Sequence, residues 1–203
     1  MTLRFALLAA LSSRPRTGYD LVQIFDSSVD YIWHAPHPQI YLELRKMESD
    51  GLIEARELPR GERGVKREYR LSDAGLEELR RQASTPEEPA RERDPQRLKA
   101  AYMEFADPAR AREQFELQVA HWRRWLADWT AMRDRLADRT DPILLERLGR
   151  RPAEEHDAIV AWKVFAYEGL IARARMEIAW ARKGIELVRA LEGDQTAAGT
   201  SAS

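Results

Sequence analysis

The residues with the clearest chemistry lie between positions 39 and 46, and all of them carry hydrogen-bonding or cationic side chains. They are Gln39, Tyr41, Arg45 and Lys46. A glutamine amide can read adenine or bond a phosphate, and tyrosine, arginine and lysine can donate to phosphates or base edges. We therefore expect this segment to contact double-stranded DNA. The alternatives are packing of Tyr41 against the first helix and ordinary solvated charges at Arg45 and Lys46.

The other side of the same segment is apolar. Ile40, Leu44 and Met47 follow the i, i+4, i+7 spacing of a helix that buries one face. Pro38 suits the first helical turn, where its missing N–H is not needed, and Gly51 suits a left-handed C-terminal cap. The spacing predicts an amphipathic helix that directs its polar side outward.

A second basic group follows in residues 56–70, which hold six basic and three acidic residues. Glycines and a proline predict a turn over 59–64 between two strands. The candidate phosphate contacts on this hairpin are Arg63, Lys66 and Arg67. Phosphate contacts position a protein on DNA without reading its sequence. The alternative is a solvated hairpin of mixed charge, in which Arg67 instead pairs with Glu48 or Glu68.

Helical periodicity and capping residues place these two segments within a larger unit. The pattern predicts three helices, then two strands, then a helix that begins after Ser72. This order, over residues 1–83, is that of a winged helix-turn-helix domain. Three prolines among charged residues predict a linker over 84–96.

The rest of the chain has the pattern of long helices, so the fold class is mainly α, with a winged helix-turn-helix domain and a coiled-coil-like dimerisation domain over 97–192. The last helix carries apolar residues in alternating steps of three and four, a heptad pattern. We expect this stripe to face an antiparallel neighbour at 115–136 and a second subunit. The residues expected at the dimer interface are Tyr167, Ile171, Ile178, Ile185 and Val188. Residues 193–203 are small and polar, and we expect them to be disordered.

Tryptophans are concentrated in this helical domain. Trp122, Trp125 and Trp129 recur on one predicted helix, and indole rings stack well on flat aromatic molecules. The three residues are candidates for binding a small aromatic effector, such as a phenolic acid. The alternative is that they form the core of the dimer.

Composition argues against several other classes. There are no cysteines, which fits a cytoplasmic protein. The net charge of −1 gives no indication of nucleic-acid binding by the chain as a whole. No apolar run approaches the roughly 18 residues of a membrane span. His34 and His37 have a metal-ligand spacing but no third ligand beside them. We find no nucleophile elbow and no phosphate-binding glycine loop, so we expect neither enzymatic activity nor a cofactor.

Three motifs, in this order and spacing, give the N-terminal domain a family resemblance. They are Thr17-Gly18-Tyr19-Asp20-Leu21, Gln39-Ile40-Tyr41-x-x-Leu44-x-x-Met47-Glu48-x-x-Gly51-Leu52-Ile53 and Arg67-Glu68-Tyr69-Arg70-Leu71-Ser72-Asp73-Ala74-Gly75. Residues 3–83 resemble the PadR family of transcriptional regulators. The resemblance implies a homodimer that binds a pseudo-palindromic operator, usually as a repressor released by a small ligand. The alternative function is a helical scaffold that binds proteins or small molecules without DNA.

Overall fold

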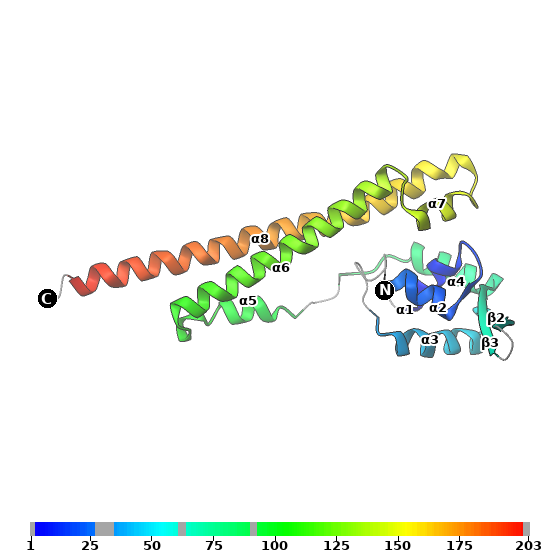
Figure 1. The fold of residues 1–203 in the computed structure, drawn as a ribbon, viewed down its shortest axis with the longest axis horizontal. Helices are drawn as coiled ribbons and strands as arrows, with labels where there is room; N and C mark the ends of the chain where they lie inside the picture. The colour runs from blue at the N-terminus through cyan, green and yellow to red at the C-terminus, as the bar shows by residue number, and fades with distance from the viewer. Residues whose placement is uncertain (1–2, 27–34, 61–63, 90–92, 201–203) are drawn as a thin grey trace. The chain divides into compact units, whose positions relative to one another are not determined.

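The computed structural model describes residues 3–26, 35–60, 64–89 and 93–200. The chain divides into two compact units, Met1–Pro89 and Ala90–Ser203, whose elements are labelled in Figure 1. The predicted linker, 84–96, contains this division. Each unit is described by itself below.

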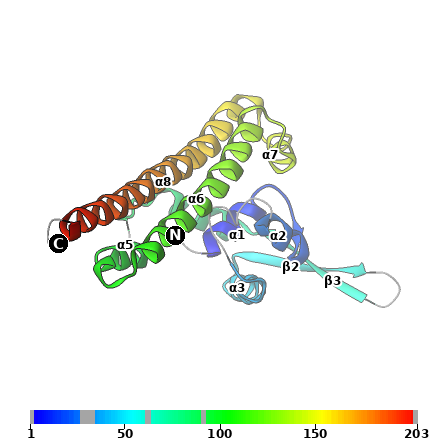
Figure 2. The ribbon, with the colours of Figure 1, turned by 60° about the vertical axis from the view of Figure 1, so that its left-hand side comes forward.

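The first unit is a winged helix-turn-helix domain, as the sequence predicts. Its elements are α1 (Leu3–Leu11), β1 (Arg16–Thr17), α2 (Gly18–Ile24), α3 (His37–Ser49), β2 (Ile53–Arg60), β3 (Gly64–Leu71) and α4 (Asp73–Ser84). The strands form an antiparallel sheet in the order β1-β3-β2. The β2–β3 hairpin is the predicted wing, and it projects beyond the helices in Figure 2. Strand β1 was not predicted, because two residues carry no periodicity.

The core of this unit determines which side of α3 faces outward. Ile40, Leu44 and Met47 have no exposed surface and pack with Leu7 and Leu21 from α1 and α2. Each such side chain contributes about 1.5–3 kcal/mol when it is removed from water. Rotation of α3 about its axis would expose all three, so this burial holds its polar side outward.

The C-terminus of α3 ends in the predicted left-handed glycine cap. Gly51 has φ of +73°. Its N–H donates to the carbonyl oxygen of Glu48 at 3.0 Å, and the N–H of Leu52 donates to that of Met47 at 2.9 Å. These two bonds are the Schellman pattern, which satisfies carbonyl groups that the helix leaves unpaired. The cap turns the chain from α3 directly into β2.

A single hydroxyl joins this cap to the start of α4. The Ser72 hydroxyl donates to the carbonyl of Gly51 at 2.7 Å and accepts from the N–H of Gly75 at 3.0 Å. Gly75 packs so closely that a Cβ atom there would overlap the carbonyl oxygen of Leu52. Position 75 therefore excludes every residue with a side chain unless α4 shifts.

The second unit is helical throughout its described part, residues 93–200. Its elements are α5 (Pro95–Ala100), η2 (Met103–Phe105), α6 (Pro108–Ala137), α7 (Pro142–Leu148), η3 (Ala153–Glu155) and α8 (His156–Thr200). Helices α6 and α8 run antiparallel side by side (Figures 1 and 2). Prolines occupy the first turns of α5, α6 and α7, with an aspartate cap before each one. Helix α8 extends into the segment predicted to be disordered, because propagating a helix requires no new nucleus.

A buried ion pair attaches α5 to α8. Glu177 is 6% exposed, and its carboxylate accepts from the Arg97 guanidinium at 3.1 and 3.2 Å. Arg97 also lies over the ring of Trp180, 4.7 Å from its centroid, and bonds Asp94 at 2.6 Å. The side chain of Arg97 thus neutralises a carboxylate that burial would otherwise destabilise.

No helix in the described part of the chain is long and apolar enough to cross a membrane.

Replacing Gly75 with alanine should destabilise the winged-helix unit by about 2 kcal/mol, the cost of overpacking a close backbone contact. The free energy of unfolding from urea titration measures this effect. Ala74→Ser on the same turn, where residue 74 is exposed, should change it by less than about 0.5 kcal/mol. Equal effects of the two substitutions would show that the close approach at Gly75 is not needed.

Candidate nucleic-acid interface

The outer side of α3 carries all four side chains that the sequence singled out. Gln39, Arg45 and Lys46 are exposed, and Tyr41 is 41% exposed. They lie opposite the buried side of a helix of 13 residues. The structure therefore places them together on one free surface, while their contact with DNA remains a prediction.

Strand β1 brings the start of α2 beside the wing. Arg16 pairs with Tyr69 of β3, and Thr17 pairs with Glu68. Between α2, α3 and β3 lies a hollow of about 520 Å³. Its lining is Thr17, Gly18, Tyr19, Asp20, Tyr41, Val65, Lys66, Arg67 and Tyr69. Polar and basic groups from three elements thus converge on one concave surface.

Arg67 joins the wing to α3. Its guanidinium donates to the carboxylate of Glu48 at 2.6 Å and lies 5.7 Å from the centroid of the Tyr69 ring. This is the pairing that the sequence left open as an alternative to a phosphate contact. The Arg67 side chain remains 43% exposed, so pairing does not remove it from the surface of the hollow.

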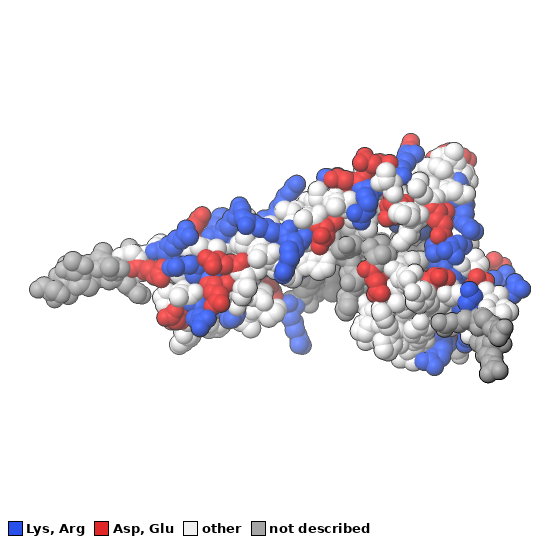
Figure 3. Space-filling model, in the orientation of Figure 1, with Lys and Arg blue, Asp and Glu red and all other residues white. Residues whose placement is uncertain are grey.

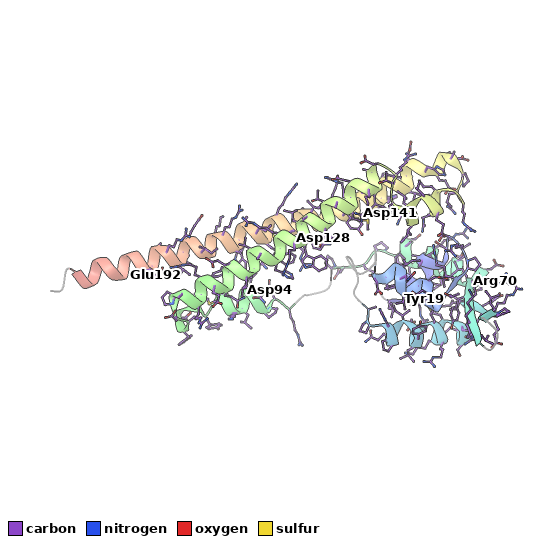
Figure 4. The ribbon with its side chains drawn as sticks, in the orientation of Figure 1. Tyr19, Arg70, Asp94, Asp128, Asp141 and Glu192 are labelled. Atoms are coloured by element: carbon purple, nitrogen blue, oxygen red, sulfur yellow. The ribbon has the colours of Figure 1, made fainter. Side chains whose placement is uncertain are left out.

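Tyr19 is the site residue that sequence reasoning missed. It is 64% exposed, lines the hollow, and its hydroxyl accepts from the Gln23 amide at 2.8 Å. Figure 4 labels it on α2. Tyr19 belongs to the motif at 17–21, which could have marked it as a candidate. Helical spacing alone, however, does not indicate which elements meet at that motif.

Tyr41 lies across the start of α2, which explains the glycine at position 18. A Cβ atom on Gly18 would lie 2.5 Å from a ring carbon of Tyr41. The ring packs against the second helix, whereas the alternative interpretation of the sequence placed it against the first. Tyr41 is still 41% exposed, and its contact with DNA stays a prediction. The ring therefore forms one wall of the hollow.

A capping box fixes the start of α2 at the edge of the hollow. The Thr17 hydroxyl accepts from the N–H of Asp20 at 3.2 Å, and the Asp20 carboxylate accepts from the N–H of Thr17 at 2.8 Å. Burial acts to raise the pKa of Asp20, but hydrogen bonds to its carboxylate from the backbone N–H and the side chain of Thr17, with the charges of Arg14 and Arg16, outweigh burial and lower the pKa.

The remaining predicted cations are placed as follows. Lys46 on α3 and Lys66 on β3 make no ion pair within the described residues. Arg63 lies outside the described residues. Arg70, labelled in Figure 4, pairs with Glu54 of β2 at 2.5 Å. Lys46 and Lys66 are therefore the cations best able to take a phosphate without breaking an existing pair.

The three candidate effector tryptophans form an aromatic cluster along α6. The ring centroids of Trp125 and Trp129 are 5.2 Å apart, and those of Trp122 and Trp129 are 6.4 Å apart. His121 lies edge-on to Trp122 at 5.3 Å. Trp129 is 5% exposed, and its buried indole N–H has no hydrogen-bond partner among the residues that the structure describes. A buried donor without a partner costs about 1–3 kcal/mol, so the cluster would gain from an acceptor there.

The predicted dimerisation residues lie on the side of α8 that meets α6. Four of them, Tyr167, Ile171, Ile178 and Val188, are buried in the single chain, and Ile185 is partly buried. Ile178 and Val188 share a core with Phe115 and Val119 of α6. Helix α6 of the same chain thus covers these residues, and their role in dimerisation stays a prediction.

The fold, with an exposed helix and a wing beside it, is that of the winged helix-turn-helix class of proteins. Residues 7–81 match the transcriptional regulator PadR-like family. The negative transcriptional regulator PadR of Bacillus subtilis is 29% identical over 145 residues, covering 70% of this chain and 78% of the relative. The N-terminal unit is thus similar to the PadR-like family, and both of these findings name transcriptional regulators.

Other relatives extend the comparison. The probable transcriptional regulator Rv1176c of Mycobacterium tuberculosis is 38% identical over 91 residues, which are 45% of this chain and about half, 48%, of that relative. The crystal structure of Bacillus subtilis PadR with operator DNA has a TM-score of 0.71 at 23% identity and covers 92% of this chain and 98% of that one. The Vibrio cholerae virulence activator AphA has a TM-score of 0.67 at 22% identity, covering 94% and 99%. At such identities the structures show a shared fold.

Asp20→Asn should lower the free energy of unfolding of the winged-helix unit by about 1 kcal/mol at pH 7, the usual contribution of a capping interaction. The pKa of Asp20 is lower in the folded state than its ordinary 3.8. The stabilisation is therefore present above about pH 4 and is lost as the pH falls through the folded pKa.

Urea titrations of Asp20→Asn and the wild type between pH 7 and pH 2.5 measure this difference. Glu57→Gln, an exposed carboxylate on β2, serves as the control and should show little difference at any pH. A deficit of Asp20→Asn that is unchanged at low pH would contradict the role of the carboxylate charge.

Proposed function

We propose that this regulator is a ligand-responsive repressor that binds a pseudo-palindromic operator as a homodimer. The observation that carries the proposal is the free polar side of α3, beside a hollow that basic wing residues border. Helix α3 would enter the major groove, and the hollow would take the sugar-phosphate backbone at its edge.

The charge distribution supports a local rather than a global attraction to DNA. The chain has a net charge of −1, and acidic and basic side chains are interspersed over the face drawn in Figure 3. DNA binding must then depend on a few well-placed cations, of which Arg45, Lys46 and Lys66 are exposed. Each phosphate contact adds about one unit to the slope with which the logarithm of the binding constant falls against the logarithm of the salt concentration.

Two copies of α3 would be needed for an operator site. A single helix reads a few base pairs, and half-sites must lie about 34 Å apart to be read from one side of the duplex. A ligand that prefers one arrangement of the helical unit would change the separation of the two reading helices and so release DNA.

The tryptophan cluster on α6 is the proposed effector site. Stacked indoles suit a planar ring, and the unpaired N–H of Trp129 suits an acceptor oxygen on the ligand. A Bacillus subtilis PadR structure with p-coumaric acid, at 22% identity and a TM-score of 0.66, supports an aromatic acid as the class to test.

Lys66→Ala should weaken binding to the operator and to random duplex alike and lower the salt slope by about one, because it removes a phosphate contact. Lys46→Ala should act mainly on the operator if this residue reads bases. Mobility shifts on the DNA upstream of the protein's own gene, at two salt concentrations, measure both effects.

Arg110→Ala is the matched control, because Arg110 is an exposed cation of the helical unit paired with Glu113. It should leave DNA affinity unchanged. Wild-type binding no tighter to the upstream region than to random duplex would refute operator recognition.

Trp129→Phe should weaken binding of p-coumaric acid several-fold, because it removes one hydrogen-bond donor worth about 1 kcal/mol while it retains an aromatic ring. Quenching of tryptophan fluorescence during titration gives the affinity. Trp180→Phe, which alters an indole outside the cluster, should leave the affinity unchanged. If the ligand neither quenches fluorescence nor releases DNA, the effector proposal fails.

A further inference from the structure

Helix α3 carries more acidic than basic side chains, although its outer side is the proposed DNA contact. Glu43, Glu48 and Asp50 lie on the helix and at its C-terminal cap. Its lysines and arginines are Arg45 and Lys46. Duplex DNA carries one negative charge for about every 1.7 Å of its axis, so carboxylates without a cationic partner would repel it. The helix therefore depends on other elements for the neutralisation of its acidic side chains.

The spacing along α3 places each of its cations beside a carboxylate of the same helix. Lys46 follows Glu43 by three residues and precedes Asp50 by four. Arg45 precedes Glu48 by three. Opposite charges three or four residues apart are neighbours on a helix and stabilise it as pairs. In the structure, however, neither Arg45 nor Lys46 forms an ion pair with any described residue, and both are exposed.

One arginine of α1 holds the two carboxylates that flank Lys46. The Nε atom of Arg4 donates to the Glu43 carboxylate at 2.7 Å, and its Nη1 atom lies 2.8 Å from the carboxylate of Asp50. A guanidinium presents its N–H groups in a fixed fork, so it can bind two carboxylates at once, whereas a lysine is a single point charge. The side chains of Arg4 and Glu43 are 29% and 18% exposed, so water reaches the pair only in part. The hydrogen bond with Glu43 is the main cause that raises the pKa of Arg4.

The other acidic side chains around α3 have partners of their own. The charge of Arg4 also acts on Glu78 of α4, but Glu78 accepts two hydrogen bonds from the Arg81 guanidinium, both at 2.7 Å. Glu48, on the other flank of α3, is bonded to Arg67 of the wing. Within the described residues, each carboxylate of α3 and its cap is therefore bonded to an arginine from another element.

We propose that Arg4 is a positioning residue for DNA binding: it holds Glu43 and Asp50, and so leaves the Lys46 ammonium free to contact the duplex. The inference rests on the proposed contact of α3 with DNA and adds a residue of α1 that was not among the predicted contacts. Arg67 differs from Arg4, because it would have to leave its carboxylate before it could reach a phosphate. Arg4 can keep both of its carboxylates while Lys46 binds.

A purely structural role explains the contacts of Arg4 less well. The burial of Ile40, Leu44 and Met47 already decides which side of α3 faces outward. Ion pairs that remain partly exposed contribute little to stability, and the side chain of Asp50 is 48% exposed. We therefore expect the loss of Arg4 to change DNA affinity rather than the free energy of unfolding.

Arg4→Gln tests the proposal, because glutamine removes the charge but keeps a polar side chain. Without Arg4, Glu43 and Asp50 become free to pair with Lys46. Affinity for duplex DNA in mobility-shift assays should then fall about two- to fivefold, the scale of two surface ion pairs on a helix. Lys46→Ala should cost less in the Arg4→Gln chain than in the wild type, because the ammonium is already engaged. Equal losses in the two chains would overturn the proposal.

Removal of the two carboxylates gives the matched rescue. Glu43→Gln and Asp50→Asn, added to Arg4→Gln, should restore affinity to within about twofold of the wild type, because neither acidic side chain remains to hold Lys46. A triple variant that binds as weakly as Arg4→Gln would show that Arg4 supports the packing of α1 on α3, and would overturn the proposal. A large loss of stability of Arg4→Gln in urea titration would contradict it as well.

Arg80→Gln is the control for net charge. Arg80 is an exposed cation on α4 of the same unit, 3.8 Å from Glu77, so the substitution makes the same change in charge. It should alter DNA affinity by less than about twofold. A loss equal to that of Arg4→Gln would show a general effect of charge and would overturn the proposal.

The same assays separate this inference from operator recognition. A wild type that binds the upstream DNA no tighter than random duplex would overturn operator recognition alone. The affinity for random duplex would still measure the coupling of Arg4 with Lys46, because a free ammonium also attracts phosphates without reading bases.

Discussion

The complete burial of Ile40, Leu44 and Met47 is the constraint on which the exposed polar side of α3 depends. Those three side chains hold α3 at one rotation about its axis, and a slip of one residue would turn it by about 100°. Gln39, Arg45 and Lys46 are outward only because the other side of the helix is held inward. The chemistry of the site is thus set by apolar packing rather than by any polar contact.

Much of this arrangement follows from local sequence patterns. Apolar spacing, capping residues and the glycine after α3 predicted the helices and the wing, because each depends on neighbours within one or two turns. The pairing of β1 with β3 was not predictable, since two residues give no period and their partner is about fifty positions away. Tyr19 was missed for the same reason: only that pairing brings α2 to the wing.

The helical unit shows a different limit of sequence reasoning. Helix α8 carries apolar residues on more than one side, such as Ile171 and Ile178 on one and Trp162 and Phe165 on another. Their spacing does not indicate which side meets α6 of the same chain. The ion pair of Arg97 with Glu177 joins residues eighty positions apart, so it also has no local signal. The side of α8 that packs on α6 depends on complementary shapes of the two helices, since the ring of Phe115 lies directly against Gly184.

The Arg67–Glu48 pair has a consequence for the cost of association. It ties the wing to α3 before any duplex arrives, so part of the ordering entropy of the hairpin is already spent in the free protein. In the proposed complex with DNA, a phosphate at Arg67 would have to replace the carboxylate of Glu48 as the partner of the guanidinium.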